Sequence, residues 1–129
     1  MAIPPNAKSI GQPLDPADVL DFEATLSQGA ADSTPTPFLL DDENVAGFEL
    51  VLTSEAMAAG LEIRSGSGYP APVIVGTVLT FWLGVEPALQ GSTAFNGSGV
   101  TVGIELTATT TSNPPRVKQR TFTVQVANQ

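Results

Sequence analysis

The sequence predicts an all-β domain, built as a sandwich of two antiparallel sheets. Two observations favour this class: several short segments alternate apolar and polar residues, and turns rich in glycine and proline separate them. The chain has 129 residues, with 12 glycines and 11 prolines, which is enough for one domain with a real core. Charged residues make up only 14% of it, against about 25% in an average domain.

Residues 72–85 form the longest nearly uninterrupted apolar run and hold the only tryptophan, Trp82. β-Branched and aromatic residues dominate the run, and Gly76 and Gly84 argue against a buried helix, so we expect one strand here. Its two faces are both apolar. This pattern predicts a strand covered on both sides, or on one side by another chain, with Trp82 in the core.

Residues 1–16 carry prolines at positions 4, 5, 13 and 16 and show almost no periodicity. Such a segment is extended and is a poor sheet interior. We therefore divide the chain into an N-terminal arm, residues 1–16, and a sandwich, residues 17–129, whose core begins near Leu20. The arm is expected to lie on neighbouring subunits, or else on its own domain. Its candidate contact residues are Ile3, Pro4, Pro5, Ile10 and Leu14.

Alternation predicts the remaining strands at residues 18–27, 45–53, 100–110 and 120–126, with shorter ones at 38–40 and 61–64. Residues 54–60 are the only helical segment expected, with Ser54 as the N-cap and Gly60 as the stop. The apolar parity of these strands predicts the core: Phe22, Phe48, Leu50, Ile63, Leu79, Phe81, Ile104, Leu106, Phe122 and Val124.

Three loops carry candidate contact residues. The acidic turn at residues 41–44 has oxygen ligands for a hard cation such as calcium, but it lacks the ligand spacing and central glycine of a calcium loop, so we expect a solvated turn and no metal. Tyr69 lies at the tip of a Gly/Ser/Pro loop. Phe95 lies in a long polar connection, where it either anchors the loop on the core or contacts a partner.

The net charge of −8 is unevenly distributed. Residues 1–63 contain eleven acidic residues and one cation, whereas residues 64–129 contain two acidic residues and four cations. An acidic surface repels nucleic acid. The asymmetry either serves solubility alone or provides patches that meet head-to-tail between copies. In the second case the basic contact residues are Arg116, Lys118 and Arg120.

The chain has no histidine and no cysteine, so the usual general base, the strongest nucleophile and disulfides are all missing. Asp21 and Glu23 share a strand face and are the one carboxylate pair a glycosidase could use, but a solvated face is the simpler interpretation. No phosphate-binding loop, signal peptide or membrane span is recognisable. We expect a protein that is not an enzyme and needs no cofactor.

Five segments, taken in order, resemble a family of small bacteriophage virion domains. These are the Asp-Pro-Ala-Asp-Val-Leu-Asp-Phe opening at residues 15–22, the Gly-Leu-Glu-Ile strand after an alanine-rich corner at 60–63, the apolar segment at 77–84, the threonine-rich strand at 106–111, and the Arg-Thr-Phe-Thr-Val-Gln-Val ending at 120–126. The resemblance covers residues 15–127. The chain departs from it at Phe22, where the family has tyrosine, at residues 83–85, where the family often has paired glycines, and in the length of the loop after Glu86.

The resemblance implies an immunoglobulin-like sandwich without catalytic residues. It also implies a structural protein of the virion, a capsid decoration (cement) or head-fibre subunit that is made in the host cytoplasm. Such a subunit binds the shell of major capsid protein, and copies of itself, on the capsid surface, with no nucleic acid or membrane partner. The alternative is a tail or tail-fibre module that recognises a host-surface carbohydrate through exposed aromatic residues, for which Tyr69, Trp82 and Phe95 are the candidates.

Overall fold

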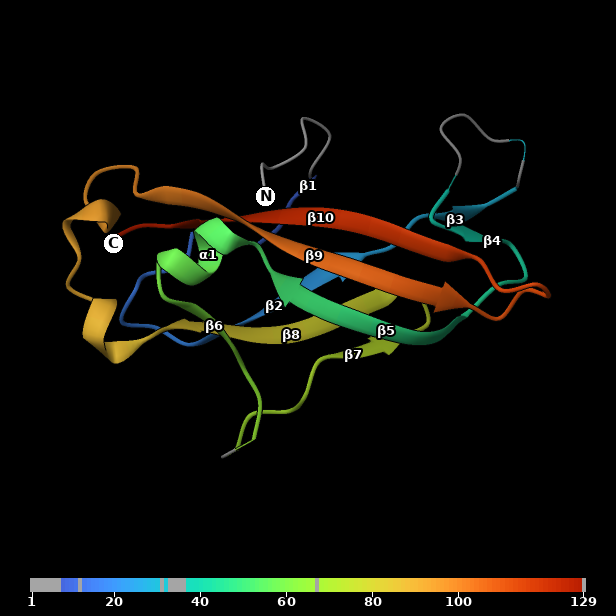
Figure 1. Cartoon of the computed structure of the whole chain (residues 1–129), viewed down its shortest axis with the longest axis horizontal. Coiled ribbons are helices and arrows are strands. Elements are labelled where there is room, and N and C mark those ends of the chain that lie inside the picture. The colour runs from blue at the N-terminus through green and yellow to red at the C-terminus, as the bar shows by residue number, and fades with distance from the viewer. Residues whose placement is uncertain (1–7, 12, 31, 33–36, 67, 129) are drawn as a thin grey trace.

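The computed structural model describes residues 8–11, 13–30, 32, 37–66 and 68–128, and its strands form two main sheets that face each other (Figure 1). The first, here the β9 sheet, has the order β1 (Lys8–Ser9), β10 (Val117–Val126), β9 (Val100–Thr110) and β5 (Val45–Leu52). The second, the β8 sheet, has the order β2 (Leu20–Thr25), β8 (Val78–Val85) and β6 (Leu61–Arg64), with β7 (Val73–Val75) also paired to β8. A small parallel pair, β3 (Gln28–Gly29) and β4 (Leu39–Leu40), lies at one end. The predicted all-β sandwich is confirmed.

The longest ladder joins β9 to β10, and it shows why alternation was informative. The two strands are antiparallel from Val117 opposite Thr109 to Val126 opposite Val100. The predicted boundaries of β9 are confirmed, and β10 begins three residues earlier than expected. Most inward-facing residues of both strands are buried, among them Phe122, so the predicted register of the last strand is confirmed.

The apolar run at residues 72–85 is a hairpin, so the prediction of one continuous strand is wrong. β7 ends at Val75, the chain turns at Gly76, where φ is 61°, and β8 begins at Val78 opposite Val75. Since the turn reverses the strand direction, the parity of the run changes there. Leu79, Phe81 and Leu83 therefore face the core, whereas Trp82 lies half-buried on the outer face and is not a core residue.

β1, Ile10 and Leu14 belong to the sandwich, which corrects the predicted boundary at residue 16. β1 pairs in parallel with β10 at Phe122 and Thr123, and the N–H of Leu14 donates to the carbonyl of Gln125 at 2.8 Å. Ile10 and Leu14 are buried in the core cluster. The core therefore begins before Leu20, and these two side chains are not contacts for a neighbour. Residues 1–7, which include Ile3, Pro4 and Pro5, lie outside the described residues.

The predicted core is largely confirmed. Seven of its ten residues are buried, and the other three, Phe48, Leu50 and Ile63, are partly buried against the cluster. Four phenylalanines are among the largest fully buried side chains: Phe38, Phe81, Phe95 and Phe122. The full burial of Phe95 means that it anchors its loop on the core, so its candidate role as a partner contact is wrong.

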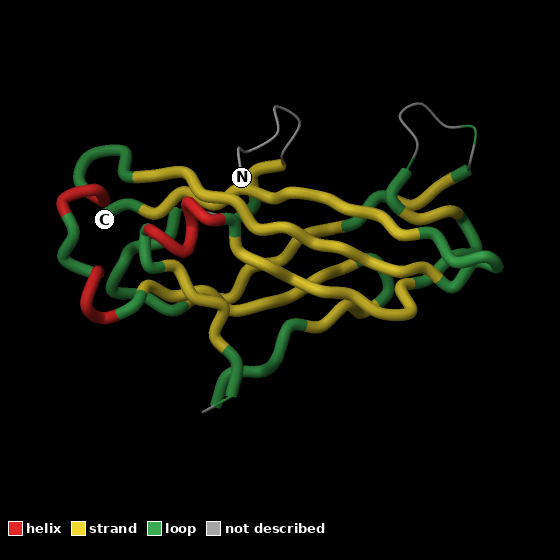
Figure 2. The backbone as a smooth tube through the Cα atoms, viewed as in Figure 1, coloured by secondary structure: helices red, strands yellow, loops and turns green. Residues whose placement is uncertain are grey.

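The helical segments lie at one end of the sandwich (Figure 2). α1 (Ser54–Ala58) joins β5 to β6, and its N-cap is Thr53 rather than the predicted Ser54, because the Thr53 hydroxyl accepts from the N–H of Ala56. Gly60, with φ of 90°, ends the corner as expected. Two short 3-10 turns, η1 (Pro87–Leu89) and η2 (Thr93–Phe95), follow β8.

Candidate interaction surfaces

The outer face of the β8 sheet carries a pair of aromatic rings beside charged residues from two neighbouring strands. Trp82 of β8 lies opposite Asp21 of β2 on one side and Arg64 of β6 on the other. Tyr69, from the loop between β6 and β7, packs against Trp82 with a distance of 5.5 Å between ring centroids and an angle of 51° between ring planes. Both rings are half-buried, so each keeps part of its surface in contact with solvent. This cluster of four residues is named the Trp82 patch.

The loop that presents Tyr69 is fixed by its own backbone. Gly66 and Tyr69 exchange two hydrogen bonds, from the N–H of Gly66 to the carbonyl of Tyr69 at 2.8 Å and in the reverse sense at 3.0 Å. Glycines at 66 and 68 adopt φ of 81° and 96° in this tight turn, a conformation that other residues rarely adopt. The position of Tyr69 is therefore set by the turn as well as by its contact with Trp82.

Arg64 lies flat over Gly84 at the edge of the patch. A Cβ atom at Gly84 would lie 2.9 Å from Arg64 Nε, so only glycine leaves room for the guanidinium there. Arg64 Nη2 donates to the carbonyl of Val85 at 3.3 Å and pairs with Glu62 Oε1 at 3.2 Å. Arg64 Nε is buried and has no hydrogen-bond partner within the described part of the chain. The guanidinium is thus held in place by Glu62 and Val85, while its side chain stays 28% exposed.

Beyond the patch, the same face has one apolar side and one acidic side. On β7, Val73 and Val75 are 45% and 71% exposed, which is unusual for valine. On β2, across the sheet from them, Asp21 and Glu23 are exposed to solvent. The carboxylates therefore form a solvated face, as the sequence predicted, and their side chains point away from the domain.

The outer face of the β9 sheet differs in composition from that of the β8 sheet. It presents the valine–threonine face, a set of five uncharged residues on adjacent strands: Val51, Thr107, Thr109, Val117 and Gln119. Val117 is 68% exposed and Val51 is 41% exposed. Glu49 and Glu105 are the charged residues paired with this set. Both sheets thus leave hydrophobic side chains in solvent, but only the β8 sheet combines them with aromatic rings.

Arg116 is not available for a partner, which corrects its predicted role. Its Nε donates to Glu43 Oε2 at 2.9 Å, and its Nη2 forms an ion pair with Glu43 Oε1. The N–H of Leu40 and the hydroxyl of Ser112 donate to the same carboxylate. Glu43 is 3% exposed. This ion-pair clasp ties the turn after β4 to the turn between β9 and β10.

The acidic turn is therefore only partly the solvated turn that was predicted, since Asp41 and Asp42 are exposed but Glu43 is buried. The Arg116 guanidinium holds the pKa of Glu43 far below its ordinary value, and it outweighs the effect of burial, which raises that pKa. The clasp spans 73 positions of sequence, so no local pattern could reveal it.

The other two basic candidates lie on β10. The Arg120 guanidinium carbon lies 5.5 Å from the centroid of the Phe38 ring, within reach of a cation–π contact. Lys118 is half-buried. A role for Lys118 and Arg120 in binding an acidic neighbour stays a prediction.

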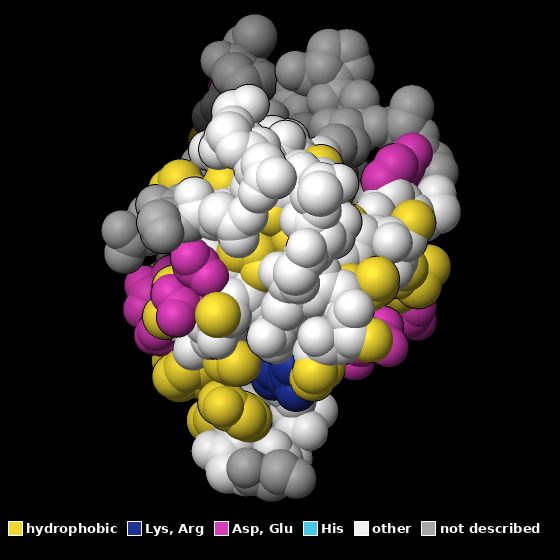
Figure 3. All heavy atoms as spheres, turned by 90° about the vertical axis from the view of Figure 1, so that its left-hand side faces the viewer, with side chains coloured by type: hydrophobic (Ala, Val, Ile, Leu, Met, Phe, Trp, Pro, Cys, Tyr) yellow, Lys and Arg dark blue, Asp and Glu magenta, His cyan; other side chains and the backbone are white. Residues whose placement is uncertain are grey.

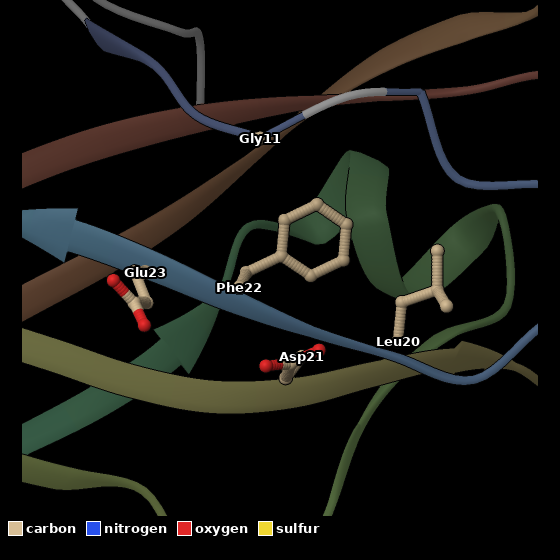
Figure 4. Close-up of a pocket in the computed structure, with 5 residues that line it drawn as sticks. All are labelled: Gly11, Leu20, Asp21, Phe22 and Glu23. Atoms are coloured by element: carbon tan, nitrogen blue, oxygen red, sulfur yellow. The ribbon is translucent and has the colours of Figure 1, made fainter.

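A shallow hollow of about 260 Å³ lies beside the edge strand β2 and is lined by Gly11, Leu20, Asp21, Phe22 and Glu23 (Figure 4). The Phe22 ring points toward Gly11, whereas both carboxylates lie on the opposite side of the strand. Gly11 adopts φ of 63°, and a Cβ atom there would lie 2.5 Å from the Phe22 ring. The hollow lies where the N-terminal segment passes close to β2. The polar side chains around it do not point toward a common centre, as a ligand site would require.

The inventory of the described residues shows no cluster of three or more acidic side chains that could hold a metal ion. Within the same part of the chain, no helix is long and apolar enough to cross a membrane. The sequence matches neither a protein-family model nor a curated protein. The candidate sites are therefore the two outer faces, and their chemistry must be argued from their own residues.

Proposed function

We propose that this protein is a structural subunit of a bacteriophage virion, without enzymatic activity. In this proposal it is a capsid decoration (cement) or head-fibre protein that binds the shell of major capsid protein and sits on the capsid surface beside copies of itself. The observation that carries the proposal is the valine–threonine face, an exposed and largely uncharged surface on a rigid sheet. The resemblance of the motif order to small bacteriophage virion domains supports the proposed class of partner.

The valine–threonine face has the composition of a protein-binding surface. The buried centres of protein interfaces are depleted in charge, and exposed valines gain free energy when a partner removes them from water. Val117 and Val51 are such residues, and the threonines between them offer hydroxyl groups without a net charge. A sheet changes shape little on binding, so the loss of conformational entropy is small.

The edge of the β9 sheet is a second candidate contact region. β1, the first described strand, forms that edge. We keep the arm as a proposal for residues 1–7 alone, with Ile3, Pro4 and Pro5 as its contacts to a neighbouring subunit. Such an arm adds contact area, and many copies on one shell multiply weak contacts.

The test compares two exposed valines on opposite sheets. Particles are assembled with wild-type protein, Val117→Asp or Val75→Asp, and the bound chain is quantified by mass spectrometry and located by cryo-electron microscopy. Val117→Asp should lower occupancy by at least about tenfold, because it places a desolvated charge in the interface. Val75→Asp, with similar exposure on the β8 sheet, should leave occupancy unchanged. Particles that never contain the chain, or equal losses for both variants, would contradict the proposal.

A further inference from the structure

We propose that the Trp82 patch binds a neutral oligosaccharide of pyranose units. Trp82 and Tyr69 supply the stacking surface, Arg64 supplies hydrogen-bond donors, and Asp21 supplies acceptors. The proposal goes beyond the structural role proposed above and does not depend on it, because the patch lies on the sheet opposite the valine–threonine face. It can be tested on the isolated protein.

The aromatic pair provides the first part of the argument. One face of a pyranose ring is a patch of C–H groups, which packs on an aromatic ring while the hydroxyl groups remain at the rim. Trp82 and Tyr69 meet at 51° with centroids 5.5 Å apart, so their partly exposed rings form two walls rather than a flat strip. Aromatic rings that are rigid and half-buried lose little entropy when a ligand covers them.

The polar groups provide the second part. Arg64 and Asp21 flank Trp82 on the two neighbouring strands, so donors and acceptors lie on both sides of the ring. The guanidinium is already oriented by Glu62 and by the carbonyl of Val85. Its Nε is buried, but the side chain as a whole is 28% exposed, so its terminal N–H groups are the donors that a ligand would meet. Sugar hydroxyls both donate and accept, and therefore suit a site with a fixed guanidinium beside a carboxylate.

The charges around the Trp82 patch determine which class of saccharide it can bind. Three carboxylates, those of Asp21, Glu23 and Glu62, lie on this face with the single guanidinium of Arg64. On the end of the molecule shown in Figure 3, Lys and Arg side chains appear in one place, bordered by hydrophobic side chains, and acidic side chains lie on both flanks. An acidic surround repels uronic and sialic acids, so the structure assigns the patch to uncharged sugars.

The experiment uses the only tryptophan of the chain, because its fluorescence reports directly on the patch. Wild-type protein is titrated with maltohexaose and with chitotetraose as neutral probes, and with trigalacturonic acid as an anionic probe. A saturable shift of emission with at least one neutral probe, and none with the anionic probe, is the expected result. The proposal is overturned if neither neutral probe shifts the emission, or if trigalacturonic acid binds more tightly than both.

Three variants distinguish a role of Tyr69 in sugar binding from a role in anchoring its loop alone. Tyr69→Ala should weaken binding by at least about tenfold, since a stacking wall is lost. Gly84→Ala should weaken it as well, because its Cβ atom would displace Arg64. The control Met57→Ala, which truncates an exposed apolar side chain of α1, should bind as wild type does. If Tyr69→Ala lowers the melting temperature but leaves the fluorescence titration unchanged, Tyr69 only anchors its loop and the proposal is wrong.

Discussion

Removal of the cation from the ion-pair clasp should destabilise the domain strongly. In Arg116→Met, Glu43, which is 3% exposed in the wild type, would lose its cation and keep neutral donors such as Leu40 N–H and Ser112 Oγ. Leaving a buried charge without its partner costs about 3 kcal/mol or more. For a chain of this length, that loss corresponds to a fall of about 10–15 °C in melting temperature. Urea unfolding and calorimetry at neutral pH measure both quantities.

The reciprocal variant should cost less, and this asymmetry tests the reasoning. Glu43→Gln keeps a polar group of the same shape and leaves Arg116, whose side chain is 29% exposed and can be hydrated. We expect a loss of about 1–2 kcal/mol. Arg120→Met is the matched control on the same end of the molecule, where only a cation–π contact is lost, at a cost of about 1 kcal/mol or less.

The pH dependence gives a second readout with a defined sign. In the wild type the folded pKa of Glu43 is depressed, so its contribution to stability is complete above its ordinary value of 4.5. It declines by up to about 1.4 kcal/mol per pH unit as the pH falls below that value, because the unfolded chain binds the proton first. In Arg116→Met the largest cause that lowers the pKa of Glu43 is absent, so stability should fall less steeply on acidification than it does in the wild type. Equal stability of Arg116→Met and Arg120→Met, with parallel pH profiles, would refute this account of the clasp.

The remaining predictions concern the core and the N-terminal segment. Leu14→Ala should reduce the free energy of unfolding by about 2–5 kcal/mol, measured by urea denaturation, because Leu14 is fully buried. Phe122→Ala should cost about 3–5 kcal/mol in the same assay. Gly11→Ala should cost about 2 kcal/mol or more, since its Cβ atom would collide with Phe22. Gly97→Ala, also at positive φ but in open space, should reduce the free energy of unfolding by less. Equal reductions for Gly11→Ala and Gly97→Ala would show that the structure relieves the collision with Phe22.

Local alternation predicted the strands well where one face is buried and the other is solvated. β9 was predicted with its observed bounds, and the inward set of β10 was predicted with its observed register. The same rule failed at residues 72–85, because an apolar run does not show where it folds back on itself. Gly76 was the available signal, since a glycine inside a strand pattern often marks a turn. Interpreting Gly76 as a turn would have placed Trp82 on the outer face of the β8 sheet.

The site residues missed by the sequence depend on contacts between distant segments. The pairing of Glu43 with Arg116 and the position of Arg64 over Gly84 are set by the packing of strands. The prolines near residue 14 indicated an arm, but the bonds of Leu14 to Gln125 and Ala127 show that an extended segment can also complete a sheet edge. Proline restricts the backbone and does not decide which surface the chain lies on.

The parallel pairing of β1 with β10 also fixes the order of events during synthesis. Ile10 and Leu14 leave the ribosome long before their hydrogen-bond partners, Thr123 and Gln125, are made. β10 must therefore emerge before the β9 sheet can be completed, and contacts of such long range form slowly. Until then β9 has no β10 beside it, and its open edge is exposed to other nascent chains. A translational pause placed before β10 should consequently lower the yield of folded protein more than a pause placed after it.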